Sequence, residues 1–297
     1  MPSPDLESTY GALLIGVFIS FFFQGILSVQ AYLYYETFPG DSLKLKALVA
    51  VVWTLDLAHL VLISQAVYHY LVLSWGNDAA LIETSITLDL HLIPLTLSIM
   101  ACQAYFLDRV WKFSKNAILT GILAVACLTS GILTIVMTGQ TIQSNTIGKD
   151  LGEVITVFSL GAAADLSIAG VLCWYLRREM TIFDRINSLL SRIIQLTLAT
   201  GLATSLLALG CLVAYVVSPK SLIFVAMHFS LGRMYTNALL ATLMSRGSLR
   251  EHLTPPCASE WSDTPPTLSA PVFIIPSETK STDEKQSSGR DALFLMV

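Results

Sequence analysis

Three ionisable residues lie near the middle of long apolar segments, at a depth where a charge is costly in a membrane and therefore usually serves a function. They are Asp56, Asp165 and Arg233. A lone arginine at that depth needs an anionic or carbonyl partner. We predict that Asp56 pairs with Arg233, because the segments that carry them would be the second and the last of seven sequential helices. In a ring these two helices are neighbours, whereas the helix of Asp165 is farther away.

Other polar residues share helix faces with these three. Trp53 lies three residues before Asp56 and His59 lies three residues after it, so helical spacing places all three on one side. The last apolar segment carries two comparable polar stripes. The candidate ligand-site or polar-network residues are Trp53, Asp56, His59, Asp165, His228, Arg233, Tyr235 and Asn237. Spacing alone leaves open a ligand pocket, an ion path, a hydrogen-bonded switch, or hydrogen bonds that only hold the bundle together.

No motif of an enzyme is present in the sequence. G-x-S-x-G, H-E-x-x-H and a Gly-rich phosphate loop are all absent. The histidines are not expected to converge as metal ligands, since His91 lies towards one face, His59 lies near the middle and His228 is alone on its helix. Every lysine lies in a loop, a helix end or the tail, which argues against a retinal Schiff base inside the bundle. We therefore expect no catalytic residues, no metal and no cofactor, with a membrane enzyme kept as a minor alternative.

The composition of the chain indicates a membrane protein. Of its 297 residues, 54% are hydrophobic and 13% are charged, which is about half the charged fraction of a soluble domain. A soluble protein could not cover its apolar surface with so few charges, but lipid-facing helix sides need none. The formal net charge of −4 gives no sign of a nucleic-acid partner.

Seven apolar segments are long enough to cross a bilayer, which takes about 20 residues of helix. The third segment is the weakest, because Asp89, His91 and Pro94 interrupt its first half. The sequence thus predicts an all-α membrane protein, a bundle of seven transmembrane helices within residues 10–246. The predicted spans cover about 10–35, 45–73, 86–107, 117–138, 151–176, 190–217 and 222–244.

The basic residues predict how the bundle is oriented. With the short N-terminus (residues 1–9) outside, only Lys149 and Lys220 fall in outer segments. Eleven basic residues then fall on the inner side: Lys44, Lys46, Arg109, Lys112, Lys115, Arg177, Arg178, Arg185, Arg192, Arg246 and Arg250. Because cytosolic loops carry an excess of Lys and Arg, we expect the N-terminus outside and the C-terminus in the cytosol.

The character of the chain changes after Arg246. Residues 247–297 are rich in Ser, Thr, Pro and charge and show no lasting helical or strand period, which predicts a disordered cytosolic tail. Phosphorylation of this tail and acylation of Cys257 stay open, and so does an inert, solvated tail.

Several stretches of the chain together resemble a known family. The residues that carry the resemblance are Trp53, Asp56 and His59, Tyr68-His69-Tyr70, Arg109-Val110-Trp111, and Tyr235 with Asn237. This combination resembles the fungal integral membrane proteins of domain-of-unknown-function family 6534, which are abundant in mushroom-forming species. The resemblance covers nearly all of residues 10–246 and implies a seven-helix membrane protein, but no activity. Family members often carry Lys where this chain has Arg233, which preserves the positive charge.

The leading functional hypothesis is a non-enzymatic membrane protein with a receptor- or sensor-like role. Apart from the lipid bilayer, its partner would be a cytosolic protein that contacts the basic inner loops and the Ser/Thr-rich tail, and its place would be the plasma membrane. The alternative is a transporter of a small solute or ion that uses the mid-membrane Asp and Arg residues. The sequence does not determine the ligand, the organelle or the oligomeric state.

Overall fold

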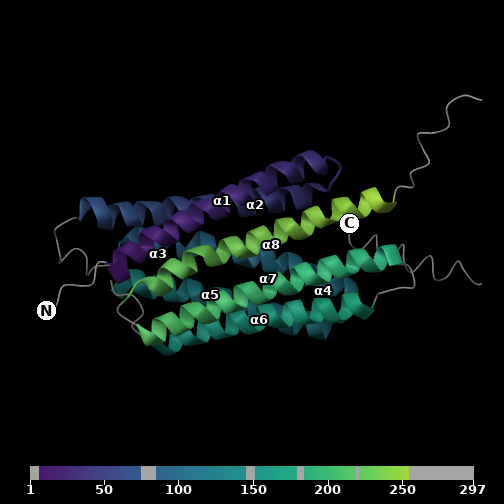
Figure 1. The fold of residues 1–297 in the computed structure, drawn as a ribbon. Coiled ribbons are helices and arrows are strands. Elements are labelled where there is room, and N and C mark those ends of the chain that lie inside the picture. The colour runs from purple at the N-terminus through teal and green to yellow at the C-terminus, as the bar shows by residue number, and fades with distance from the viewer. Residues whose placement is uncertain (1–6, 75–84, 145–150, 179–183, 219–220, 254–297) are drawn as a thin grey trace, which may run out of the picture.

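A computed structural model of the chain describes residues 7–74, 85–144, 151–178, 184–218 and 221–253. All regular structure in this part is helical. Two short π-helical turns, Glu7–Gly11 and His69–Leu73, lie next to the first two long helices at one end of the bundle (Figure 1). The α-helices are α1 (Ala12–Thr37), α2 (Leu43–Tyr68), α3 (Ile86–Leu90), α4 (Leu92–Ser114), α5 (Ala117–Ser144), α6 (Leu151–Arg178), α7 (Asp184–Val217) and α8 (Ile223–Leu253).

The helices follow the apolar segments of the sequence. Each predicted span is helical, and the third is divided between the short α3 and the long α4. Within the described residues, five stretches are long and apolar enough to cross a membrane: Thr9–Thr37, Leu43–Leu73, Ile86–Ser114, Ala117–Gln143 and Ile155–Arg178. Helix α7 contains a shorter apolar run, Gly201–Val217. The tail is predicted to be disordered from residue 247, but α8 continues to Leu253, so this boundary is wrong. The expectations for the first six residues, for Lys149 and Lys220, and for the tail beyond Leu253 with Cys257 lie outside the described residues.

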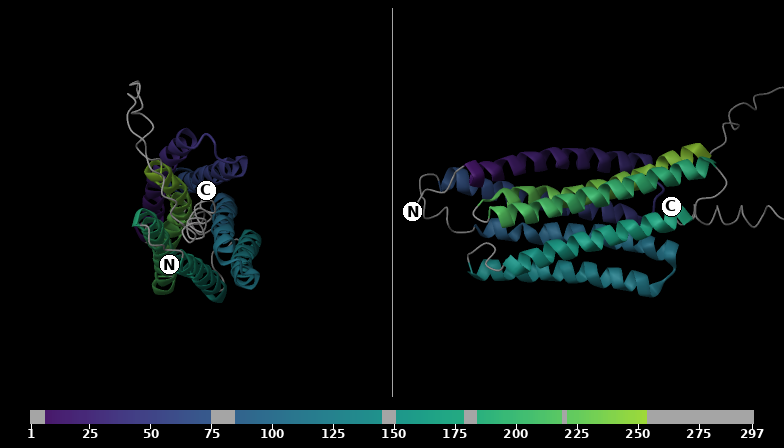
Figure 2. Two further views of the ribbon diagram at one scale, coloured as in Figure 1. Left: turned by 90° about the vertical axis from the view of Figure 1, so that its right-hand side faces the viewer. Right: turned by 60° about the horizontal axis from the view of Figure 1, so that its bottom comes forward.

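The long helices run side by side and form a ring in chain order, which Figure 2 shows along the bundle and from its side. Each of α1, α2, α4, α5, α6 and α7 packs against the next long helix, and α8 closes the ring against α1. Helix α4 also contacts α6 and α8, and α8 also contacts α2. The expected contact between the second and the last helix is therefore present, and α4 and α8 are the two helices that reach across the bundle.

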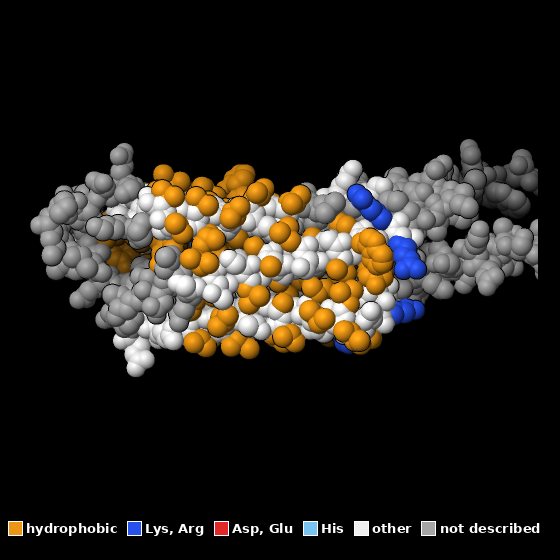
Figure 3. All heavy atoms as spheres, turned by 90° about the horizontal axis from the view of Figure 1, so that it is seen from below, with side chains coloured by type: hydrophobic (Ala, Val, Ile, Leu, Met, Phe, Trp, Pro, Cys, Tyr) orange, Lys and Arg blue, Asp and Glu red, His pale blue; other side chains and the backbone are white. Residues whose placement is uncertain are grey.

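The distribution of side chains is that of a protein in lipid. Large apolar side chains face outwards along the length of the bundle (Figure 3). Phe18, Phe22 and Val125, for example, are 62%, 67% and 63% exposed. In contrast, Asp56 and Arg233 are 1% and 0% exposed. Water would favour the opposite arrangement, whereas a bilayer rewards apolar exterior sides and forces polar groups to pair inside.

Basic side chains gather at one end of the bundle. Among the described side chains on the face seen in Figure 3, Lys and Arg lie at the end where α1 turns into α2. The described loops and helix ends there carry Lys44, Lys46, Arg109, Lys112, Lys115, Arg177, Arg178 and Arg246. We call this end of the bundle the basic end and the other the far end. The backbone thus brings together, on one side, the residues that the sequence assigned to the cytosol.

The third predicted span is interrupted where the sequence is polar. Helix α3 ends and α4 begins at His91, and Pro94 lies in the first turn of α4. Proline is tolerated there because the first turn of a helix has no hydrogen bonds for its missing N–H. The His91 side chain contacts the carbonyl oxygen of Leu88 through Nδ1 and so satisfies a group that the break exposes.

Helices α1 and α8 approach each other very closely at Gly16. A Cβ atom added to this residue would lie 2.8 Å from the carbonyl oxygen and 2.9 Å from the Cα atom of Ala226 on α8. Only a glycine permits this approach, and close backbone packing of this kind is a main source of helix association in membranes.

Candidate functional site

Arg233 on α8 is the largest fully buried side chain of the structure's described part. Its Nη1 atom donates a hydrogen bond to the carbonyl oxygen of Phe229 at 2.8 Å and lies 2.9 Å from His59 Nδ1 on α2. Its Nη2 atom donates to the backbone carbonyl oxygen of Asp56 at 3.3 Å. The guanidinium fork therefore joins α8 to α2 through a carbonyl and an imidazole.

The Asp56 side chain has different partners. Ser98 Oγ on α4 donates to Oδ1 at 3.0 Å, and Thr236 Oγ1 on α8 donates to Oδ2 at 2.6 Å. Among the described residues, no ion pair joins the Asp56 carboxylate to Arg233. The prediction of an ion pair between the two side chains is therefore wrong, although the two residues are in contact as predicted. Hydroxyl groups hold both carboxylate oxygens, and the arginine contacts the backbone.

A second polar contact joins three helices near Asp165 on α6. Gln103 Nε2 on α4 donates to Oδ1 at 3.1 Å, and the hydroxyl group of Tyr235 on α8 donates to Oδ2. Helix α6 lies farther from α8 than α2 does, as expected, but the long Tyr235 side chain spans the distance. The sequence does not identify three of these site residues, Gln103, Ser98 and Thr236. Thr236 follows Arg233 by three positions, so the spacing rule used for α2 would have found it.

Three histidines form a row across the bundle. The ring centroids of His59 and His91 are 5.3 Å apart, and those of His91 and His228 are 6.4 Å apart. The bundle thus brings the three rings side by side, which their positions along the sequence do not predict. The break at His91 and the start of α8 lie at the far end, and α2 runs deep enough from the basic end to bring His59 beside them. Among the described residues, no group of three or more His, Cys, Asp or Glu side chains is placed to hold a metal ion.

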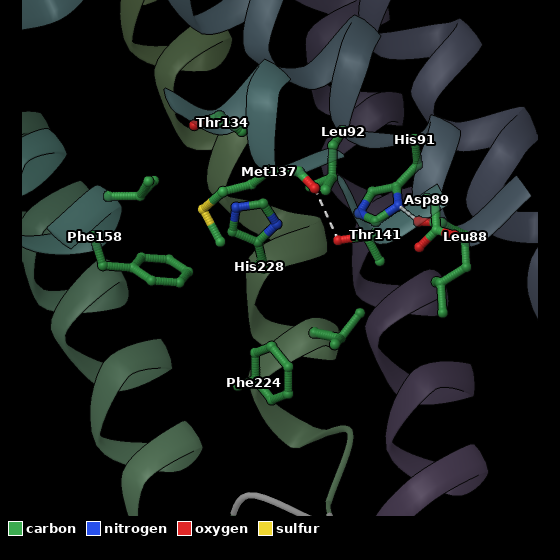
Figure 4. Close-up of a pocket in the computed structure, with 12 residues that line it drawn as sticks. Leu88, Asp89, His91, Leu92, Thr134, Met137, Thr141, Phe158, Phe224 and His228 are labelled. Atoms are coloured by element: carbon green, nitrogen blue, oxygen red, sulfur yellow. Dashed lines mark hydrogen bonds between the residues drawn. The ribbon is translucent and has the colours of Figure 1, made fainter. Parts of the chain in front are cut away.

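A cavity of about 140 Å³ opens beside this row at the far end, between α3, α4, α5, α6 and α8 (Figure 4). We call it the end cavity. Its walls are mostly apolar, and the ring of His228 lies between Phe158 and His91 (Figure 4), with centroids 5.5 Å from Phe158. Asp89, Thr134 and Thr141 add polar groups. A few convergent polar groups in an apolar wall are the usual composition of a small-molecule site.

Two smaller cavities continue from the end cavity towards the basic end. The middle cavity, of about 70 Å³, shares Thr134, Phe158 and His228 with the end cavity. The third cavity, of about 40 Å³, shares the Asp165, Gln103 and Tyr235 cluster with the middle cavity. The polar cluster around Asp165 therefore lies between two cavities.

The other candidates serve the packing of the helices. Trp53 Nε1 donates to Ser28 Oγ on α1 at 3.1 Å, and Asn237 Nδ2 donates to the carbonyl oxygen of Arg233 on its own helix at 2.7 Å. Neither residue lines the end or the middle cavity. Of the predicted site residues, His228, Asp165 and Tyr235 line these cavities, while Asp56, His59 and Arg233 form the buried network behind them.

Comparison with known proteins agrees with the resemblance seen in the sequence. The family described as "Family of unknown function (DUF6534)" has a model that matches residues 161–248. The chain is similar to this family over that region. The match to the DUF6534 family runs from α6 to α8 and includes Asp165 and Arg233. No curated protein and no solved structure matches the chain.

Proposed function

We propose that this chain is a seven-span membrane protein, with its N-terminus outside and its C-terminus in the cytosol, that binds a small molecule in the end cavity and has a receptor- or sensor-like role without enzymatic activity. The observation that carries the proposal is the end cavity itself. Its volume of about 140 Å³ is close to that of an engineered apolar cavity that binds benzene. Several polar groups reach into it from three sides of the bundle, which would orient a ligand.

The basic residues support the orientation. Since cytosolic segments carry the excess of Lys and Arg, the basic end would face the cytosol and the end cavity would open towards the outer side. A ligand arriving from outside would then contact α8 near His228, and α8 continues to the basic end. A displacement of α8 on ligand binding would therefore be transmitted to a cytosolic partner at the basic loops or the tail. The fungal source, the plasma membrane and this partner remain predictions.

The orientation can be tested with cleavable tags and a protease that cannot cross the membrane, so that it cleaves only the tags on the outer side of intact cells. A tag before residue 10 should be cleaved from outside in intact cells, and a tag at the C-terminus should be cleaved only after permeabilisation. An N-terminal tag that stays protected in intact cells would contradict the orientation.

Ligand binding can be tested by filling the cavity. Thr134 lines both the end and the middle cavity, so Thr134→Phe should abolish the thermal stabilisation that small aromatic amphiphiles give the purified chain in nanodiscs. Ile132 on the same helix is 56% exposed on the lipid side, and Ile132→Phe should leave that stabilisation unchanged. If both variants respond like the unaltered chain, the end cavity is not the binding site.

A transporter is the second candidate, because the three cavities follow one another along the bundle and share lining residues. A transporter would carry a labelled solute across sealed liposomes, and Asp165→Asn would reduce this flux. Ligand-induced stabilisation without flux would favour the receptor- or sensor-like role.

A further inference from the structure

The charged side chains that line the three neighbouring cavities are acidic. Asp89 and His91 line the end cavity, and Asp165 lines the middle and the third. Among the described residues, no Lys or Arg lines any of them. Arg233 lies behind the walls, where its donors are directed to α2 and to its own helix. The lining therefore complements a ligand that donates hydrogen bonds and carries positive charge.

Asp165 provides the strongest of these acceptors. Its side chain is held by the amide of Gln103 and the hydroxyl of Tyr235, both uncharged, and the residue is 7% exposed. A carboxylate at membrane depth with only neutral partners keeps much of its desolvation cost. A cation in the adjoining middle cavity would offset this cost.

His91 provides a second acceptor nearer the far end. Its Nδ1 atom contacts the carbonyl oxygen of Leu88 and must carry the hydrogen of a neutral imidazole, so Nε2 accepts. The residue is 3% exposed, and Nε2 has no hydrogen-bond partner in the described part of the structure. A buried acceptor without a partner is costly, and a donor on a ligand in the end cavity would remove this cost.

The walls between these acceptors suit an apolar body. Phe158 lines both the end and the middle cavity, and Tyr235 lines the middle cavity beside Asp165. Aromatic rings also attract cations through their faces.

We propose that the end and middle cavities bind a small organic amine, with its ammonium group on the Asp165 carboxylate and its apolar body against Phe158 and His228. This inference rests on the proposed ligand-binding function and adds the chemical class of the ligand. The combined space suits a body about the size of benzene with a short aminoalkyl chain.

A matched pair of probes tests the role of the charge. Phenethylamine is protonated at neutral pH, whereas 2-phenylethanol has the same aromatic body without charge. Both are titrated into the full chain in nanodiscs, with binding measured by isothermal calorimetry and by the shift in unfolding temperature. The amine should bind at least about tenfold more tightly than the alcohol, which is the preference expected from one charge-assisted contact.

Two carboxylate variants then locate the preference. Asp165→Asn should reduce the affinity for the amine to that for the alcohol, and should leave the alcohol almost unaffected. Asp108→Asn is the control, because Asp108 is exposed at the basic end, where Lys112 is its ion-pair partner, and it should keep the full preference.

The outcomes separate the inference from the proposed function. Equal binding of amine and alcohol to the unaltered chain overturns the amine inference and leaves the ligand pocket standing. This comparison does not depend on the folding of any variant. Absence of binding by both probes argues against the pocket itself. A preference that Asp165→Asn retains, or that Asp108→Asn also removes, overturns the assignment to Asp165.

Discussion

Asp41 and Arg246 join the loop between α1 and α2 to the last helix at the basic end. Arg246 Nη2 lies 2.7 Å from Asp41 Oδ2, and the two side chains are only 4% and 5% exposed. The same carboxylate oxygen accepts a hydrogen bond from the Tyr34 hydroxyl at 2.9 Å, and the guanidinium lies 5.3 Å from the ring centroid of Phe38. The perturbation is Asp41→Asn, which removes the charge and keeps an acceptor of similar shape.

The burial of this pair determines the magnitude. Removing one partner of a buried ion pair leaves an uncompensated buried charge and costs about 3–5 kcal/mol. The pair of Lys112 and Asp108, at 3.2 Å, has side chains that are 43% and 55% exposed, and exposed pairs four residues apart on a helix contribute about 0.3–0.5 kcal/mol. Asp41→Asn should therefore destabilise the chain by about 3 kcal/mol or more, and Asp108→Asn by about 0.5 kcal/mol or less.

The assay is unfolding in mixed micelles with an increasing fraction of SDS, followed by circular dichroism. A double variant, Asp41→Asn with Arg246→Met, removes both charges, so it should be no less stable than Asp41→Asn alone. If Asp41→Asn costs no more than Asp108→Asn, burial does not set the strength of this pair and the reasoning is refuted. A double variant that loses the sum of the two single losses would show that the two side chains are not coupled.

Three further predictions use the same assay. Arg233→Met should cost about 3 kcal/mol or more, because His59 and two carbonyl oxygens lose their donor and each buried polar group left without a partner costs about 1–3 kcal/mol. Arg233→Lys should cost less, since it keeps a charge and some of these contacts; equal losses would contradict this. The charge swap, Asp56→Arg with Arg233→Asp, should not recover the stability that either single change loses, because Arg233 contacts backbone atoms that stay in place when the side chains are exchanged. A swapped chain as stable as the unaltered chain would show that a direct ion pair joins the two side chains. Gly16→Ala should cost about 1–3 kcal/mol by forcing α1 away from Ala226, whereas Gly25→Ala on the same helix, with nothing within 4 Å of the added Cβ, should be neutral or stabilising; similar losses in both would show that the close approach is not the cause.

The residues of the buried network show what the spacing of residues along a helix predicts and what it does not. The rule that residues three and four apart share a helix face correctly places Asp56 and His59 together beside Arg233. The same rule cannot choose between the carboxylate and the backbone carbonyl of Asp56, because this depends on which hydroxyl groups the neighbouring helices supply. Ser98 is one of these, and the spacing along α2 does not determine which face of α4 turns towards Asp56.

The row formed by His59, His91 and His228 depends on the depth of each residue in the bundle. The ends of apolar segments give this depth only to within a few residues. One helical turn covers about 5 Å, so a small error in a boundary moves a side chain from one layer of the bundle to the next. The helix is also interrupted at His91, so the depth of this residue cannot be counted as if the span were one continuous helix.

What the sequence by itself determined is the helical state of each apolar segment, the burial of its few charged residues and the gathering of its basic residues at one end. These depend on local composition and on the cost of charge in an apolar medium, which act on each segment separately. Only the tertiary structure decided that Asp165 meets Gln103 and Tyr235, and that the end cavity lies beside His91 and His228. Such contacts depend on the rotation and offset of each helix against its neighbours, and many side chains that are far apart in the sequence set these together.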